Sequence, residues 1–155
     1  MQAVYASLVA VFGTLLGAVT TYAFQRRAAE SAMRSSRADR LREDRLAVYS
    51  AFAAAVTDYR SSQYWRWEFM QLDPASPESA AAALESHRLR GLTRQIRWRL
   101  QLLTDDQELV QLADAAVIEA RNVGSADDVA DRKRRHDLTG MAVERFVLHA
   151  ATHVR

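Results

Sequence analysis

The stretch SPESAAAALESHRLRGLTRQIRWRLQLLTDDQ (residues 76–107) holds the signals that decide the fold. Ser76 is a favoured N-cap and Pro77 suits the first helical position, so a helix is predicted to begin there. Thr104 and Gln107 then form a capping-box pattern that predicts the start of another helix. Between these signals, apolar residues recur at three- and four-residue steps, as in an amphipathic helix: Leu89, Leu92, Ile96, Leu100 and Leu103. Two capped helices in direct succession predict a helical bundle.

A helix is also predicted before this stretch, from about Leu41 to Leu72. It ends at Asp73-Pro74, because the residue before a proline is pushed out of the α region. Its apolar side chains share one helical face: Tyr49, Phe52, Val56 and Tyr59.

Two further helices are predicted after the stretch. The first ends at Val123-Gly124 and carries an apolar face made of Leu109, Leu112, Ala113, Ala116, Val117 and Ala120. The second runs from about Ala126 to His153 and is capped by Ser125 with Asp128. Its predicted seam is Val129, His136, Gly140, Val143, Val147 and Ala150. Short connections favour an antiparallel up-down bundle, in which the turn at residues 103–104 and the C-terminus lie at the same end.

The composition agrees with a helical domain in a reducing compartment. The chain has 155 residues with no cysteine, two prolines and five glycines. The lack of cysteine excludes a disulfide-stapled extracellular domain, and the few turn-forming residues disfavour a sheet-rich fold. The formal net charge is +2, and every basic residue except Lys133 is arginine. A genome rich in G and C would produce this bias without selection for nucleic-acid binding.

The first residues form an uncharged apolar run, AVYASLVAVFGTLLGAVTTYAF (residues 3–24). Roughly 20 helical residues cross a hydrocarbon core of about 30 Å, so the run predicts a single N-terminal transmembrane helix. Arginines directly behind the run favour a single-pass location in the cell membrane, with the N-terminus outside and the C-terminal domain cytoplasmic. A cleaved signal peptide and a buried soluble helix are the alternatives, but the run lacks a positive n-region.

The predicted fold class is therefore all-α, with a transmembrane helix followed by a cytoplasmic antiparallel bundle of about four helices. The predicted domains are a transmembrane anchor (1–24), a charged juxtamembrane segment (25–40) and the cytoplasmic bundle (41–155). Alternating charges without proline or glycine favour a helix for the middle segment, and a flexible tether is the equal alternative.

Small residues recur on one face of the apolar run. Gly13 and Gly17 make a GxxxG pattern, which Ala6, Ala10 and Thr21 extend into a stripe. In lipid such a stripe lets two helix backbones pack closely, so these residues are predicted to mediate self-association or pairing with another span. The alternative is the ordinary abundance of glycine and alanine in membrane helices.

Arginines accumulate around Trp98 on the helix that begins at Pro77. Basic residues beside an aromatic side chain can contact nucleic-acid phosphates, and basic residues near a membrane can contact anionic lipid. The candidate lipid or phosphate contacts are Arg26, Arg27, Arg94, Arg97 and Arg99. The alternative is pairing with acidic residues of the following helix, or simple solvation. The basic run at residues 132–135 allows the same alternatives, because three aspartates lie one turn upstream.

The densest aromatic stretch of the chain lies at residues 64–70. Its side chains point in several directions around a helix, so one core face cannot bury them all. Tyr64, Trp65 and Trp67 are therefore candidates for a partner surface. Core packing of at least two of the aromatic residues is the alternative.

His149 and His153 are four residues apart and share a helical face, a spacing that can hold a metal. No cysteine is available and no acidic residue of the same turn completes the ligand set, so the sequence predicts neither a metal nor a cofactor. The chain also lacks a glycine-rich phosphate loop, a nucleophile elbow and an HExxH motif. The sequence therefore predicts that the protein is not an enzyme.

The stretch LREDRLAVYSAF (residues 41–52), together with the apolar run and the arginine-rich segment behind it, is similar to a plan found in small, uncharacterised actinobacterial membrane-anchored proteins. The resemblance covers about the first third of the chain. It implies a single span before a helical domain, and it implies no activity and no site residue.

These features predict a non-enzymatic, membrane-anchored interaction or scaffold subunit of a homo- or hetero-oligomeric assembly. The predicted partners are membrane lipid and other subunits of a membrane protein complex, and nucleic acid is not favoured. Two alternatives stay open: a membrane-active phage or prophage factor for lysis or channel formation, and a membrane-tethered nucleic-acid binder.

Overall fold

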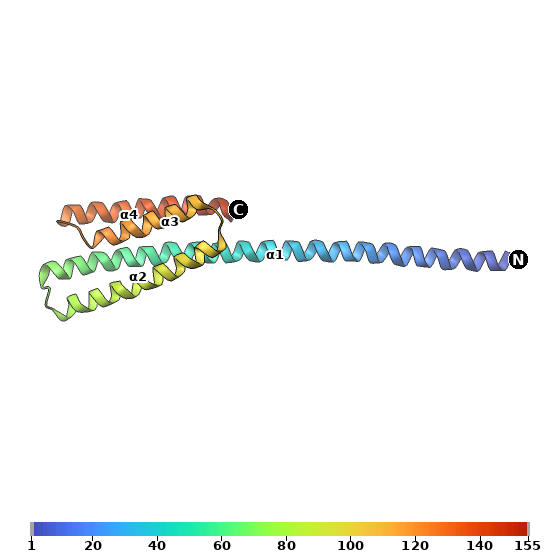
Figure 1. The fold of residues 1–155 in the computed structure, drawn as a ribbon, viewed down its shortest axis with the longest axis horizontal. Helices are drawn as coiled ribbons and strands as arrows, with labels where there is room; N and C mark the ends of the chain where they lie inside the picture. The colour runs from blue at the N-terminus through green and yellow to red at the C-terminus, as the bar shows by residue number, and fades with distance from the viewer. Residues whose placement is uncertain (1, 155) are drawn as a thin grey trace. The chain divides into compact units, whose positions relative to one another are not determined.

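All the regular secondary structure in the described part of the chain is helical. The computed structural model describes the backbone of residues 2–154, and the side chains of Tyr22, Gln25, Arg26, Met33 and residues 35–154. The helices, labelled in Figure 1, are α1 (Gln2–Leu72), α2 (Pro77–Leu103), α3 (Gln107–Val123) and α4 (Val129–Ala150), with a final 3₁₀ turn η1 (Ala151–His153). No strand occurs among residues 2–154. The predicted all-α fold class is confirmed.

The chain divides into two compact units, Met1–Leu41 and Arg42–Arg155. The first unit contains only the early part of α1. Residues 25–40, for which the sequence left a helix and a flexible tether open, are helical within it. The second unit contains the rest of α1 with α2, α3, α4 and η1, and it is the helical bundle. The predicted domain boundaries at residues 24 and 40 stay predictions.

The structure corrects the predicted single-pass location in the cell membrane, with the N-terminus outside and the bundle in the cytoplasm. Within the described part of the chain, no helix is both long enough and apolar enough to cross a bilayer. A span needs about 20 successive apolar residues, whereas the described side chains before Leu41 are exposed and include Arg26 and Arg37. The small-residue stripe (Ala6, Ala10, Gly13, Gly17 and Thr21) lies outside the described side chains, as does Arg27.

The bundle has the predicted antiparallel up-down arrangement. At one end, Arg45 Nε donates to the Leu103 carbonyl over 3.1 Å, and Arg42 Nε donates to the Val154 carbonyl. At the other end, Trp67 Nε1 donates to the Ala126 carbonyl over 2.7 Å. The turn at residues 103–104 and the C-terminus therefore lie at the same end of the bundle, as predicted.

The helix starts follow local capping chemistry, with corrections for α3 and α4. Ser76 caps α2 as predicted, and its Oγ accepts from the Ser79 amide over 3.1 Å. The α3 cap is Asp106 rather than Thr104, because Asp106 directly precedes the helix and its Oδ1 accepts from two backbone amides. The α4 cap is Asp128, whose carboxylate accepts from the Asp131 amide over 2.7 Å, without Ser125.

The core lies where α1 and α3 were predicted to bury side chains. Tyr49, Phe52, Val56 and Tyr59 of α1 are all buried. Phe146 of α4 packs against them, with its ring centre 4.7 Å from that of Phe52. The fully buried residues of α3 are mostly the predicted ones, with Val123 added: Leu109, Ala113, Ala116, Ala120 and Val123. The small alanine side chains of α3 let α4 pack closely against it.

The predicted seam of α4 is wrong by about one residue. Val129 is 62% exposed and Val147 is 45% exposed. The residues that α4 buries are Arg132, Thr139, Ala142, Phe146 and Ala150. Two of these are polar, and each has an internal partner, so apolar periodicity could not identify the buried face. Ala150 is common to the predicted and observed seams, and Val143 of the predicted seam is partly buried against the core.

Candidate functional site

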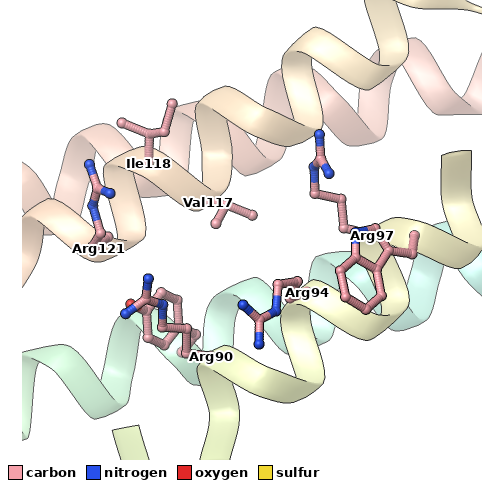
Figure 2. A pocket seen from close by; sticks show the side chains of 8 residues that line it. Arg90, Arg94, Arg97, Val117, Ile118 and Arg121 are labelled. Atoms are coloured by element: carbon pink, nitrogen blue, oxygen red, sulfur yellow. The ribbon is translucent and has the colours of Figure 1, made fainter. Parts of the chain in front are cut away.

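Three arginines line one face of α2 at intervals of one helical turn. Arg90, Arg94 and Arg97 are spaced by four and three residues, the steps that bring helical side chains to the same side. Figure 2 shows them across from α3, which contributes Val117, Ile118 and Arg121. Together these side chains enclose a groove of about 210 Å³. We call this site the arginine groove, and its lining residues are Tyr59, Arg90, Arg94, Arg97, Trp98, Val117, Ile118 and Arg121.

The arginines of the groove differ in their pairing. Arg97 is fixed by Asp114 of α3, with 2.8 Å between Nη2 and Oδ2, and this hydrogen bond raises the pKa of Arg97. Among the side chains that the structure describes, no carboxylate lies within ion-pair distance of Arg90, Arg94 or Arg121. The groove therefore carries positive charge that no described side chain of the bundle neutralises.

Aromatic and aliphatic groups lie between these charges. The Arg94 guanidinium is 5.6 Å from the centre of the Trp98 ring, which is 54% exposed. Ile118 is 48% exposed, and Val117 is half-buried against the core. A bound group would thus meet cationic side chains and apolar surface at the same time.

A second depression of about 240 Å³ continues from the groove and shares Tyr59, Arg90 and Arg121 with it. It adds Arg66, whose Nη1 donates to Gln63 Oε1 over 3.1 Å. Gly124 lies beside this pair, and a Cβ there would stand 2.3 Å from Gln63 Oε1. Only glycine fits at that position without displacing Gln63.

The arrangement can bind anions. A guanidinium offers several N–H donors in one plane and matches carboxylate and phosphate oxygens in bidentate pairs. Three exposed guanidiniums around one groove can therefore hold several negative charges, while Trp98 and Ile118 contact apolar groups beside them.

The structure separates the three residues predicted as a partner surface. Trp67 is only 7% exposed, and its indole N–H is bonded within the bundle. Tyr64 accepts a hydrogen bond from Arg132 Nη2 over 3.0 Å, and its ring lies against the same guanidinium. Trp65 is 55% exposed and lies near Phe69. Two of the aromatic residues thus pack inside the bundle, and Trp65 lies at the surface.

The predicted lipid or phosphate contacts are likewise divided. Arg94 and Arg97 line the arginine groove. Arg99 is exposed on α2 outside the groove lining, and Arg26 is exposed in the first unit. The sequence did not single out Arg121, which reaches the groove because α3 runs antiparallel to α2. The only feature of the sequence that pointed to Arg121 is its position as a basic residue in the last turn of α3.

A second cluster joins residues that the sequence kept apart. His149 Nε2 and His153 Nε2 lie 2.7 Å and 2.6 Å from the same atom, Asp106 Oδ2. The His149 contact and the Leu109 amide hold the pKa of the Asp106 carboxyl well below its usual range. The sequence offered no acidic residue next to the two histidines as a third ligand. That carboxylate comes from the start of α3, and residue spacing within one helix could not reveal this contact.

One comparison with known proteins gives a match. Residues 46–154 match the family described as KilB plasmid transfer protein. No curated protein and no solved structure matches the chain significantly. The resemblance to actinobacterial membrane-anchored proteins stays a prediction, because this match does not test it. The matched range covers more than half of the chain and includes every residue that lines the arginine groove. The chain therefore belongs to the KilB plasmid transfer protein family.

Proposed function

We propose that this protein is a non-enzymatic interaction subunit in plasmid transfer, and that its arginine groove binds an acidic segment of a partner protein. The observation that carries the proposal concerns three groove arginines, Arg90, Arg94 and Arg121: among the side chains that the structure describes, no carboxylate lies within ion-pair distance of them. Membership of a plasmid transfer family supplies the process in which such a partner would be met.

The lining favours an acidic protein segment over other anions. An amphipathic helix that carries carboxylates beside apolar side chains offers both kinds of contact on one face. The groove matches this pattern, because Trp98 and Ile118 present apolar surface between the guanidiniums. Arginine and tryptophan are also the residue types most enriched at the energetic centres of protein interfaces.

Single-stranded nucleic acid is the second candidate, and one observation favours it. Trp98 is exposed next to Arg94, and a base can stack on such a ring while arginines contact phosphates. A nucleic-acid channel generally offers several stacking platforms along its length, whereas the arginine groove offers one exposed tryptophan. We therefore rank the acidic protein segment first.

The test is a charge reversal with a matched control. The double variant Arg90→Glu/Arg121→Glu changes the groove, and Arg99→Glu/Arg145→Glu makes the same change of net charge at exposed positions outside its lining. In the plasmid-bearing host, the groove variant should reduce plasmid transfer by about 10-fold or more, and it should lose a co-purifying protein. The reason is that two like charges facing each other across an interface cost several kcal/mol of binding free energy. The control variant should behave as the wild type.

Two outcomes would contradict the proposal. Equal loss in both double variants would mean that overall charge, rather than the groove, matters. Unchanged partners and transfer in the groove variant would remove the groove from the function. If the groove variant instead loses salt-sensitive retention of single-stranded DNA while its protein partners stay, nucleic acid replaces the acidic segment as the ligand.

A further inference from the structure

The Asp106, His149 and His153 side chains converge on one point at the end of the bundle. His149 lies in the last turn of α4, His153 ends η1, and Asp106 is the N-cap of α3. Both Nε2 atoms lie within 2.7 Å of Asp106 Oδ2, and the three ligand atoms lie within 4.8 Å of one another. The centres of the two imidazole rings are 5.5 Å apart.

We infer that these three residues bind a divalent transition-metal ion of the zinc type. Imidazole nitrogen and carboxylate oxygen are the ligands that zinc takes in proteins without cysteine. Two histidines at a spacing of four residues and a carboxylate from another helix supply three ligands. Three protein ligands leave a fourth tetrahedral position for water or for a group of a bound partner.

The surrounding backbone orients the carboxylate for this role. Asp106 Oδ1 accepts from the amides of Glu108 and Leu109 over 2.8 Å and 3.1 Å. This double contact fixes the carboxylate plane and leaves Oδ2 to the two histidines. Orientation of a ligating carboxylate by neighbouring donors is a common feature of metal sites.

The site also suits a cation and can be entered from solvent. The Asp106, His149 and His153 side chains are 22%, 25% and 29% exposed, so an ion reaches them without unfolding of the bundle. His149 lies in the last turn of α4, where the helix dipole favours positive charge, and His153 follows in η1. Glu108 Oε1 lies 3.9 Å from His149 Nδ1 and adds a second negative charge beside the cluster, which also favours a cation there.

The two oxygen–nitrogen separations must lengthen slightly to admit the ion. Zinc–ligand bonds of about 2.0–2.1 Å place ligand atoms about 3.3 Å apart around a tetrahedral centre. The present separations of 2.6 Å and 2.7 Å are shorter, so the side chains would move outward by a few tenths of an ångström. The ion would then join the start of α3 to the end of α4, independently of what the arginine groove binds.

The test uses the full chain without a histidine tag and Zn²⁺ as the probe. Asp106→Asn keeps an oxygen for the helix cap but removes the carboxylate, and His153→Gln removes one imidazole. His136→Gln is the matched control, because it removes a histidine of α4 outside the cluster. Calorimetry should show one Zn²⁺ per wild-type and control chain, and more than about 100-fold weaker binding by both cluster variants, since even outer-shell losses cost about 10–100-fold.

Thermal unfolding gives a second readout, because an ion that binds only the folded state raises the melting temperature. Saturating Zn²⁺ should raise it for the wild type and for His136→Gln, but not for the two cluster variants. Circular dichroism of each variant shows whether its helices are intact. If one of the two cluster variants is unfolded, the Zn²⁺ affinity of the other cluster variant tests the inference. Absence of saturable binding to the wild type, or unchanged affinity in a folded cluster variant, would overturn the inference and leave the cluster as an internal hydrogen-bonded clamp.

Discussion

Arg132 shows at the scale of one residue how this bundle uses arginine internally. Its side chain is only 5% exposed, and its guanidinium carbon lies 3.9 Å and 4.4 Å from the ring centres of Tyr64 and Trp67. It also donates to Glu68 and to the Tyr64 hydroxyl. Its charge is thus held between two aromatic faces and one carboxylate. The basic run at residues 132–135 could not reveal which of its members is buried.

Replacement of Arg132 should destabilise the protein strongly. Arg132→Met keeps the length of the side chain but removes the ion pair with Glu68 and the contact with two aromatic faces. We expect a loss of about 2–4 kcal/mol in the free energy of unfolding, measured with urea. Lys133→Met, one position along and exposed, is the control and should change it by about 0.5 kcal/mol or less. Similar losses in the two variants would show that Arg132 is not a structural anchor.

His136 gives the bundle a pH dependence whose sign follows from its surroundings. Burial, and then the Arg60 guanidinium, lower the pKa of His136, while Asp137 acts in the opposite direction. The folded state therefore favours the neutral ring more than the unfolded chain does. The resulting stability is present above the unfolded pKa of about 6.5 and is lost as the pH falls through the folded value.

The free energy of unfolding should consequently decrease between about pH 7 and pH 5, and His136→Gln should remove this part of the decrease. Urea unfolding of both proteins at a series of pH values, with a chelator present, measures the difference. Parallel curves for wild type and variant would show that His136 does not contribute.

At the scale of the element, the sequence predicts a helical face well only where the buried residues are apolar. The faces of α1 and α3 were predicted correctly because tyrosine, phenylalanine, leucine and alanine fill them. On α4 the core-facing positions include Arg132 and Thr139, so the apolar pattern indicated a seam displaced by about one residue. Thr139 is fully buried because its hydroxyl donates to the Arg135 carbonyl over 2.9 Å.

The same limit applies to the sites. The spacing of Arg90, Arg94 and Arg97 already indicates one basic face on α2. Arg121 and Asp106, however, reach their sites only through the pairing of α3 with α2 and α4. A spacing rule acts within one helix, so the second wall of the groove and the carboxylate of the histidine cluster required the tertiary structure.

The register of α4 can be tested with two neighbouring residues. Phe146 is fully buried between α1 and α4, whereas Val147 is 45% exposed. Phe146→Ala should reduce the free energy of unfolding by about 3–5 kcal/mol, because it removes a large side chain and leaves a cavity. Val147→Ala should reduce it by about 1 kcal/mol or less. If urea unfolding instead shows a larger loss for Val147→Ala than for Phe146→Ala, the seam predicted from the sequence would be correct.

At the scale of the whole molecule, the core and both sites belong to one unit. The buried hydrophobic core consists of residues between Val48 and Ala150, and the arginine groove and the histidine cluster lie within the same range or directly after it. The family match, residues 46–154, also falls inside the unit Arg42–Arg155. This unit therefore contains the buried contacts on which its own stability depends.

The segment 42–155 should consequently fold without the residues before it. We expect a strongly helical circular dichroism spectrum and a cooperative thermal transition at nearly the same temperature as in the full chain, because every core side chain that the structure describes lies within this segment. A shorter segment, 60–155, is the control. It lacks Phe52, Val56 and Tyr59, three fully or almost fully buried side chains of α1, and should not fold cooperatively. If 42–155 proves unfolded while the full chain melts cooperatively, residues before Arg42 must contribute to the stability of the bundle.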